Sequence, residues 1–216
     1  MRKLVVGTFL TLDGVMQAPG GPDEDRDGGF EHGGWSVNFW DEMMGRLIVE
    51  QMQLPDALLL GRRTYEIFAA HWPRVTDPND PVAAKLNSVR KYVVSRTLSR
   101  AEWRNSSVIS QDAAAHVGRL KEEHGGEIQV AGSGNLIQTL LKHDLVDEFR
   151  LWIFPVIVGS GKRLFAAGTL PGAFRLVDAQ VSSTGVAIHR YERAGRLEPG
   201  SFEVDVAGSS SELWNR

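Results

Sequence analysis

Short apolar runs alternate with amphipathic segments along most of this 216-residue chain, and this alternation limits the possible folds more than any other feature. The runs predict strands, and helical periodicity in the segments between them predicts helices. Strands are expected at 3–11, 57–60, 91–98, 106–110 and 127–131, and helices at 39–54, 63–72, 111–124 and 135–143, while 76–87 is expected to be a turn that passes into a short helix. Strands that alternate with helices indicate a mostly parallel α/β sheet. A long strand region at 147–159 and a hairpin at 174–193 then predict an antiparallel pair at one edge.

Length and composition predict one soluble domain, residues 1–194, followed by a Gly/Ser-rich tail at 195–216. A net charge of −3 provides no overall attraction to nucleic acid or to an anionic membrane. With no cysteine, disulfides and zinc–sulfur sites are excluded, which fits the reducing cytoplasm. The apolar start reads as a strand because Asp13 ends it, and "LWIFPVIVG" is too short to span a membrane.

An unusually long irregular stretch, from Val15 to Val37, is crowded with Gly, Pro and Asp. Loops of this length inside a compact domain are usually functional or disordered, so a mobile surface loop and a lid over a substrate site both remain open. Trp35, Phe39 and Trp40 at its exit favour the lid, since large aromatic rings need a surface to pack on. They are predicted to stack on a flat substrate, with packing in the core or in a dimer as the alternative.

Two strand-to-helix junctions, "LLLGRRTYE" and "VAGSGNLI", are candidate phosphate sites. The first-turn N–H groups of a helix lack partners within it, the helix dipole favours anions, and glycine lets the backbone approach closely. Arg62 and Arg63 add charged, planar donors, and "VVSRTL" places Ser95 and Arg96 at a third strand end. Each motif alone also fits a plain turn or a solvated surface, and neither a complete Rossmann fingerprint nor a P-loop is present.

In their order and spacing, "LLLGRRTYE", "KYVVSRTL", "VAGSGNLIQTLL" and "FPVIVGSGKRLF" resemble the dihydrofolate reductase-like superfamily. More narrowly, with "TLDG" near the N-terminus, they resemble the branch that contains the C-terminal reductase domain of the riboflavin-biosynthesis protein RibD. The similarity spans about Arg2 to Arg193. It implies a three-layer α/β fold with a central mixed, mostly parallel sheet of about eight strands, flanking helices and a C-terminal antiparallel hairpin. It also implies NADPH as cofactor, a small-molecule substrate and a homodimer.

The resemblance also implies roles for individual residues of this chain. Gly61, Arg62, Arg63 and Thr64 would hold the adenosine phosphates, and Ser95 and Arg96 would flank the adenine ribose. The pyrophosphate and the adjoining ribose would be held by Gly132, Ser133, Gly134, Asn135 and Leu136. Val15, Met16 and Gln17 would cover the nicotinamide. Gly159, Gly161 and Lys162 would close over the substrate.

The catalytic candidates are Asp13, which ends the first strand, and Asp41, near the start of the first helix. Asp13 also fits a turn-forming Asp-Gly pair, and Asp41 and Glu42 also fit first-turn acids that complement a helix dipole. Dihydrofolate reductase carries an acid on its first helix that binds the pterin. The nearest carboxylates here, Asp41 and Glu42, lie roughly one helical turn too early relative to Gly61, which disfavours folate reduction. The six histidines show no metal-ligand spacing, so no metal site is predicted.

These features predict an NADPH-dependent reductase that acts on a small, heterocyclic, pterin- or pyrimidine-like substrate. A sensor or scaffold that binds a nucleotide without turnover is the alternative from another class. A third alternative is an enzyme that uses a flavin or another phosphate-bearing ligand, but the two arginines favour NADP over flavin.

Overall fold

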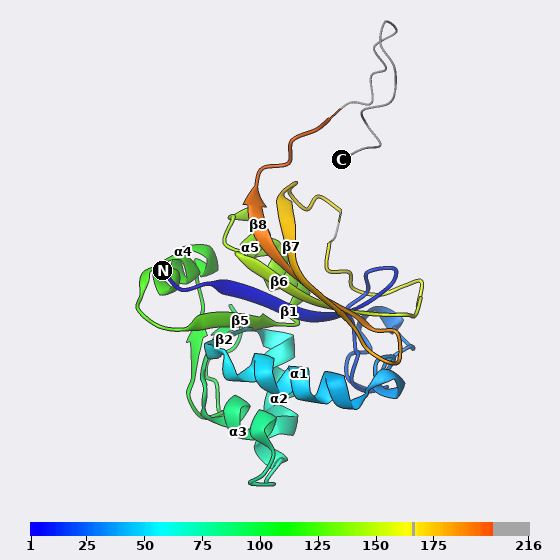
Figure 1. Ribbon diagram of the computed structural model, residues 1–216. Helices are drawn as coiled ribbons and strands as arrows, with labels where there is room; N and C mark the ends of the chain where they lie inside the picture. The colour runs from blue at the N-terminus through cyan, green and yellow to red at the C-terminus, as the bar shows by residue number, and fades with distance from the viewer. Residues whose placement is uncertain (166, 201–216) are drawn as a thin grey trace, which may run out of the picture.

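An eight-stranded sheet in the order β4-β3-β2-β5-β1-β6-β8-β7 forms the centre of the protein (Figure 1). The computed structural model describes residues 1–165 and 167–200. The strands are Leu4–Thr11 (β1), Pro55–Gly61 (β2), Arg90–Val94 (β3), Ser106–Ile109 (β4), Glu127–Ala131 (β5), Glu148–Phe154 (β6), Ala173–Val181 (β7) and Ala187–Gly195 (β8). Strands β1 to β6 pair in parallel, and β8 joins β6 and β7 antiparallel. The predicted mixed sheet with a closing hairpin at one edge is confirmed.

Helices cover both faces of this sheet, which gives three layers (Figure 1). They are Glu42–Gln53 (α1), Arg62–His71 (α2), Pro81–Ser88 (α3), Ala113–Glu122 (α4) and Gly134–Lys142 (α5). Helices α4 and α5 pack on one face in the largest apolar cluster. On the other face, α1, α2 and α3 pack in a second cluster, and α1 also packs in a third that includes Trp152 and Phe154. Two separate apolar clusters therefore lie on the α1 face.

Two predicted strands end earlier in the structure than the apolar pattern suggested. The strand region predicted at 147–159 ends at Phe154, because Pro155 lacks a backbone N–H and the chain turns there. The strand predicted at 91–98 ends at Val94, because the Ser95 hydroxyl accepts hydrogen bonds from the backbone of Thr97 and Leu98. A side-chain hydroxyl that competes for backbone donors commonly ends a regular element in this way.

The predicted domain boundary lies close to the end of the last strand, since β8 ends at Gly195. Residues 201–216, most of the predicted tail, lie outside the described residues. Within the described part of the chain, no helix is both long and apolar enough to cross a lipid bilayer.

Lys91 on β3 is a fully buried lysine, and no carboxylate in the described part of the chain pairs with it. Its Nζ donates to the carbonyl oxygens of Val89 at 2.8 Å and Arg104 at 3.2 Å, and lies 4.2 Å from the centroid of the Trp103 ring. Burial, with a smaller contribution from the charge of Arg104, lowers the pKa of Lys91 to about 8. The folded protein thus releases this proton at lower pH than the unfolded chain does.

We expect the stability of the protein to rise with pH relative to a Lys91→Met variant. Above pH 8 and below the ordinary lysine pKa of 10.5, the unfolded chain binds one proton more than the folded protein, so the free energy of unfolding increases. Urea unfolding at pH 7.5 and pH 10 should show wild type gaining about 2 kcal/mol over the variant. Lys142→Met, at an exposed lysine, is the control and should show no such change. A Lys91→Met difference independent of pH would contradict the prediction.

Candidate nucleotide site

A cleft of about 1570 Å³ opens at the carboxyl ends of the central parallel strands. Strands β2 and β5 are hydrogen-bonded neighbours, so the β2–α2 and β5–α5 junctions lie side by side in its wall. Ligands of α/β sheets bind where neighbouring strands end in such a crevice. The two glycine-containing junctions that the sequence singled out therefore form parts of one site.

Hydrogen bonds join the two junctions directly. The Ser133 hydroxyl accepts from the Gly61 backbone N–H at 2.9 Å, and the Thr64 hydroxyl accepts from the Ser133 backbone N–H at 3.1 Å. Gly132 has φ of +53°, and a Cβ there would lie 3.3 Å from the Thr64 hydroxyl oxygen. Glycine at position 132 thus allows both the left-handed backbone conformation and the close packing of the two helix starts.

The N-termini of α2 and α5 differ from those of the other helices. Asp41, Asp80 and Asp112 cap α1, α3 and α4 by accepting hydrogen bonds from first-turn N–H groups. Helices α2 and α5 begin after Gly61 and Ser133, and neither of these residues makes a side-chain capping bond. The two helices that face the cleft therefore keep first-turn donors and positive dipole ends available for an anion.

Cationic side chains surround these two helix starts. Arg62 contacts Glu66 and the Thr97 hydroxyl, whereas Arg63 extends the other way, 3.8 Å from Asp25. A recess of about 450 Å³, adjoining the cleft, is lined by Arg26, Asp27, Arg63, Asn135 and Lys162. The arginines therefore reach two different parts of the site, one beside the β3 end and one beside the α5 start.

Residues 16–27, here called the cleft loop, fold over the cleft and are fastened through Gln17. The Gln17 amide donates to the carbonyl oxygens of Asp25 and Asp27 at 3.0 and 2.9 Å, and accepts from the Lys162 backbone N–H at 3.0 Å. The Lys162 ammonium pairs with Asp25 at 2.8 Å and with Asp27 at 2.9 Å. Much of the long irregular stretch predicted between Val15 and Val37 is thus anchored against the 159–163 segment.

Most residues that the resemblance connected with a cofactor line the cleft. They are Met16, Gln17, Gly61, Arg62, Arg63, Thr64, Gly132, Ser133, Gly134, Asn135 and Leu136. Three others lie elsewhere: Val15 is buried against Phe30, Ser95 is buried as it terminates β3, and Arg96 is exposed next to it. Their roles stay predictions.

Of the predicted substrate residues, Trp40 and Lys162 line the cleft. Trp35 and Phe39 instead pack edge-on against Phe154, with ring centroids at 5.4 and 6.0 Å, and Trp35 donates to the Gln17 carbonyl oxygen at 2.8 Å. Gly159 and Gly161 lie in the turn beneath the cleft loop, where Gly161 contacts Val15. The structure thus separates these four residues from the cleft lining: Trp35, Phe39 and Gly161 pack against other residues, and the Gly159 N–H donates to Asp13.

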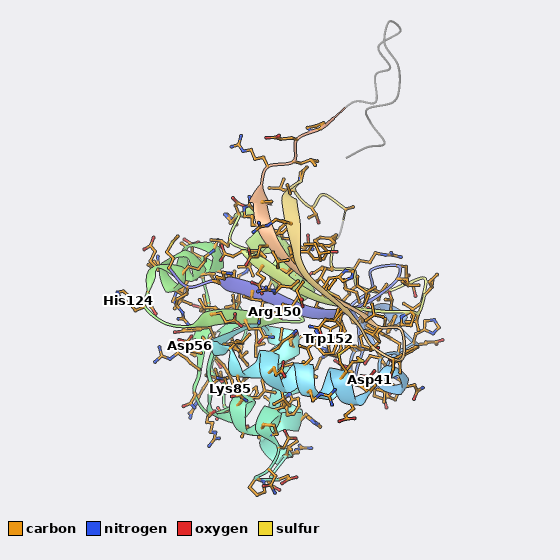
Figure 2. All side chains as sticks on the ribbon, viewed as in Figure 1. Asp41, Asp56, Lys85, His124, Arg150 and Trp152 are labelled. Atoms are coloured by element: carbon orange, nitrogen blue, oxygen red, sulfur yellow. The ribbon has the colours of Figure 1, made fainter. Side chains whose placement is uncertain are left out.

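The two predicted catalytic acids hold backbone segments together. Asp13 accepts from the Thr11 hydroxyl at 2.6 Å and from the Gly159 backbone at 3.0 Å, and the Thr11 hydroxyl, with the N–H groups of Val158 and Gly159, lowers the pKa of Asp13. Asp41 caps α1 and binds Ser183 in the β7–β8 turn (Figure 2). The N–H of Met44 and the Ser183 hydroxyl lower the pKa of Asp41. An acid kept ionised in this way is a poor proton donor.

Sequence reasoning missed a third acid and the inner surface of the cleft. Glu24 of the cleft loop lines the cleft, accepts from the Gly20 backbone N–H at 2.6 Å, and has a pKa raised by burial. Gly7, Gln51 and Gln129 line the inner surface. One sequence signal could have indicated this surface: Gly7 and Gln129 each interrupt an apolar strand. Glycine within a strand often marks a close approach of a ligand or of another backbone segment.

The sheet order, the closing hairpin and the cleft at the strand ends define the dihydrofolate reductase-like class of α/β protein. Within it, the chain belongs to the RibD C-terminal domain family, whose model matches residues 2–188. The uncharacterized protein YyaP of Bacillus subtilis is 29% identical over 188 residues, 86% of this chain and 92% of YyaP.

Two solved structures share the fold. One is a putative riboflavin biosynthesis protein from Shewanella sp. PV-4, with a TM-score of 0.67 and 20% identity, covering 89% of this chain and 99% of that one. The other is dihydrofolate reductase from Enterococcus faecalis in complex with NADP(H), with a TM-score of 0.54 and 13% identity, covering 91% of this chain and 97% of that one.

Proposed function

We propose that the protein is an NADPH-dependent reductase that transfers a hydride to a small, heterocyclic, pterin- or pyrimidine-like substrate. The observation that carries this proposal is the pair of uncapped helix N-termini, α2 and α5, in one cleft with Arg62, Arg63 and Lys162. Membership of the RibD C-terminal domain family and the NADP(H) complex of a protein with this fold support it.

The residues of the cleft fit this cofactor. The N–H groups at the start of α5 suit the pyrophosphate, since Gly132, Ser133 and Gly134 line the cleft and Asn135 and Lys162 border the same space. Arg62, beside the β3 end, suits the 2′-phosphate on the adenosine ribose. When bound, NADPH supplies the hydride. The chain's part is to orient cofactor and substrate and to cover them with the cleft loop.

Hydride transfer to a heterocycle also needs a proton, and Glu24 is the candidate donor. Glu24 is better suited to this role than Asp13 or Asp41, because it lines the cleft and its pKa is raised rather than lowered. The engagement of Asp13 and Asp41 in structural contacts is also what favours the alternative, a nucleotide-binding sensor or scaffold without turnover. A homodimer stays a prediction from the family resemblance.

We expect the purified protein to bind NADPH at least about tenfold more tightly than NADH, because a charge-assisted hydrogen bond to the 2′-phosphate contributes 1.5 kcal/mol or more, roughly. Fluorescence titration with each nucleotide measures both dissociation constants. The double variant Arg62→Ala/Arg63→Ala should bind the two nucleotides equally. Arg62→Ala alone should remove most of the preference, while Arg63→Ala should weaken both nucleotides.

Arg100→Ala is the matched control, because Arg100 is exposed, lies outside the cleft and pairs with Glu102. Its preference for NADPH should equal that of wild type. Comparable, very weak binding of NADPH and NADH to wild type would refute the cofactor assignment. An unchanged preference in the double variant would refute the role of the two arginines alone.

A further inference from the structure

The motif "VVSRTL" at the end of β3 is joined to the cleft by one side-chain contact. The family resemblance connects Ser95 and Arg96 of this motif with the adenine ribose, yet neither side chain belongs to the cleft lining in the described part of the chain. Ser95 is buried and Arg96 is exposed. The next residue, Thr97, instead contacts Arg62 of α2, which does line the cleft. The motif therefore reaches the candidate nucleotide site through Arg62.

Ser95 fixes the turn that carries Thr97. Its hydroxyl accepts from the backbone N–H groups of Thr97 at 3.2 Å and Leu98 at 3.0 Å, a bonding pattern by which serine commonly shapes a turn. The Ser95 backbone N–H donates to the Ile109 carbonyl oxygen at 3.0 Å, and Leu98 packs against the apolar cluster that contains Trp103. Both ends of the turn are thus held in place.

A second contact fixes α2 against the same segment of the chain. Tyr65 lies about one helical turn after Arg62, and its hydroxyl accepts from the Trp103 backbone N–H at 2.9 Å. Tyr65 and Trp103 are both buried, and their ring centroids lie 6.4 Å apart. The start of α2 and the turn after β3 are therefore held at a constant separation, because each is tied to the same buried cluster.

Arg62 is held from two directions, although its side chain is 48% exposed. Its Nε donates to Glu66 at 2.7 Å, and its Nη1 donates to the Thr97 hydroxyl at 2.5 Å. A guanidinium has five N–H donors in one plane, so these two bonds leave donors on Nη1 and Nη2 for a ligand. Two such donors can bind two oxygens of one phosphate in parallel.

The neighbouring Arg63 is held less firmly. Within the described part of the chain its one ion pair is with Asp25 at 3.8 Å, beyond hydrogen-bonding distance, and its side chain is 61% exposed. A long side chain that is not fixed loses rotamer freedom when it binds an anion, and this loss weakens binding. Arg62 has lost much of this freedom already, so it is the better prepared of the two arginines.

We propose that Thr97 is a positioning residue for recognition of the 2′-phosphate of NADPH, and that it acts by holding the Arg62 guanidinium in place before the cofactor binds. This inference rests on the proposed function, since it concerns how the same cleft selects its cofactor. Thr97 lies outside the cleft lining, so its effect on the cofactor passes through Arg62. Ser95 then contributes by shaping the turn, without touching the ribose.

The test measures NADPH and NADH affinities of Thr97 variants by fluorescence titration of the purified protein. Thr97→Val removes the hydroxyl and keeps the size of the side chain. It should weaken NADPH about three- to tenfold and leave NADH unchanged, because the two cofactors differ only in the 2′-phosphate. Thr97→Ser restores a hydroxyl and should recover most of the preference. Thr76→Val is the matched control, because Thr76 is an exposed threonine between α2 and α3, and it should behave as wild type.

The double variant Arg62→Ala/Thr97→Val separates positioning from direct contact. In the absence of Arg62, loss of the Thr97 hydroxyl should weaken NADPH no further, since two residues that act through one contact are not additive. A further loss would show that Thr97 binds the cofactor itself and would overturn the inference. Equal weakening of NADPH and NADH by Thr97→Val, or a preference unchanged by it, would overturn this inference alone. A wild-type protein without preference for NADPH would refute the cofactor proposal, and this inference with it.

Discussion

Replacing Arg150 with methionine is expected to lower the free energy of unfolding by about 3 to 5 kcal/mol. Arg150 lies in the middle of the sheet on β6 (Figure 2), and its guanidinium binds both carboxylate oxygens of Glu127 at 2.7 and 2.8 Å and Glu148 at 2.7 Å. The three side chains are 6%, 13% and 1% exposed, respectively. Without the guanidinium, two carboxylates would remain close together in the sheet without their main counter-charge.

The control for this prediction is Arg175→Met on the edge strand β7. Arg175 forms a single ion pair with Glu192 at 3.4 Å, and its side chain is 72% exposed. Solvent screens such a pair, so almost no change in stability is expected. Urea unfolding of both variants and of Arg150→Met/Glu127→Gln provides the comparison, with the double variant recovering part of the loss. Equal, small effects at Arg150 and Arg175 would contradict the prediction.

Replacing Gly161 with alanine is the second change with a large expected effect, about 2 to 4 kcal/mol of stability. Gly161 has φ of +121°, a conformation that residues with a side chain rarely adopt. An added Cβ would also lie 2.8 Å from Val15 Cγ1 and 2.9 Å from Phe30 Cε2, and both residues are buried. Because Lys162 anchors the cleft loop, NADPH binding should weaken together with stability.

Gly159→Ala separates the two causes. Gly159 also has positive φ, +77°, but a Cβ there would meet no atom within 4 Å. Alanine at 159 should therefore cost only about 1 to 2 kcal/mol of backbone strain. Nucleotide titration should show this variant close to wild type. Equal effects of Gly161→Ala and Gly159→Ala on stability and on nucleotide binding would contradict the prediction. Close packing beneath the cleft loop would then not explain why position 161 is a glycine.

The parts of the site that could be predicted from sequence are those built from neighbouring residues. Gly61–Thr64 and Gly132–Leu136 were recognised because each is a complete strand-to-helix junction, and they line the cleft together. Asp41 was recognised as an acid at a helix start for the same reason, and the structure shows that it caps α1. Predictions about aromatic residues were weaker: Trp35 and Phe39 suit a flat ligand in sequence, but they pack against Phe154.

The sequence by itself determined the alternation of strands and helices, the antiparallel edge and the two glycine junctions, because these depend on the conformational preferences of residues close along the chain. Tertiary structure alone decided which polar groups share a cavity. Gly7, Gln51 and Gln129 lie far apart in sequence and meet only because β1 pairs with β5 and α1 packs across that pair. Periodicity shows that a residue is buried, but the neighbours it is buried against follow from strand order.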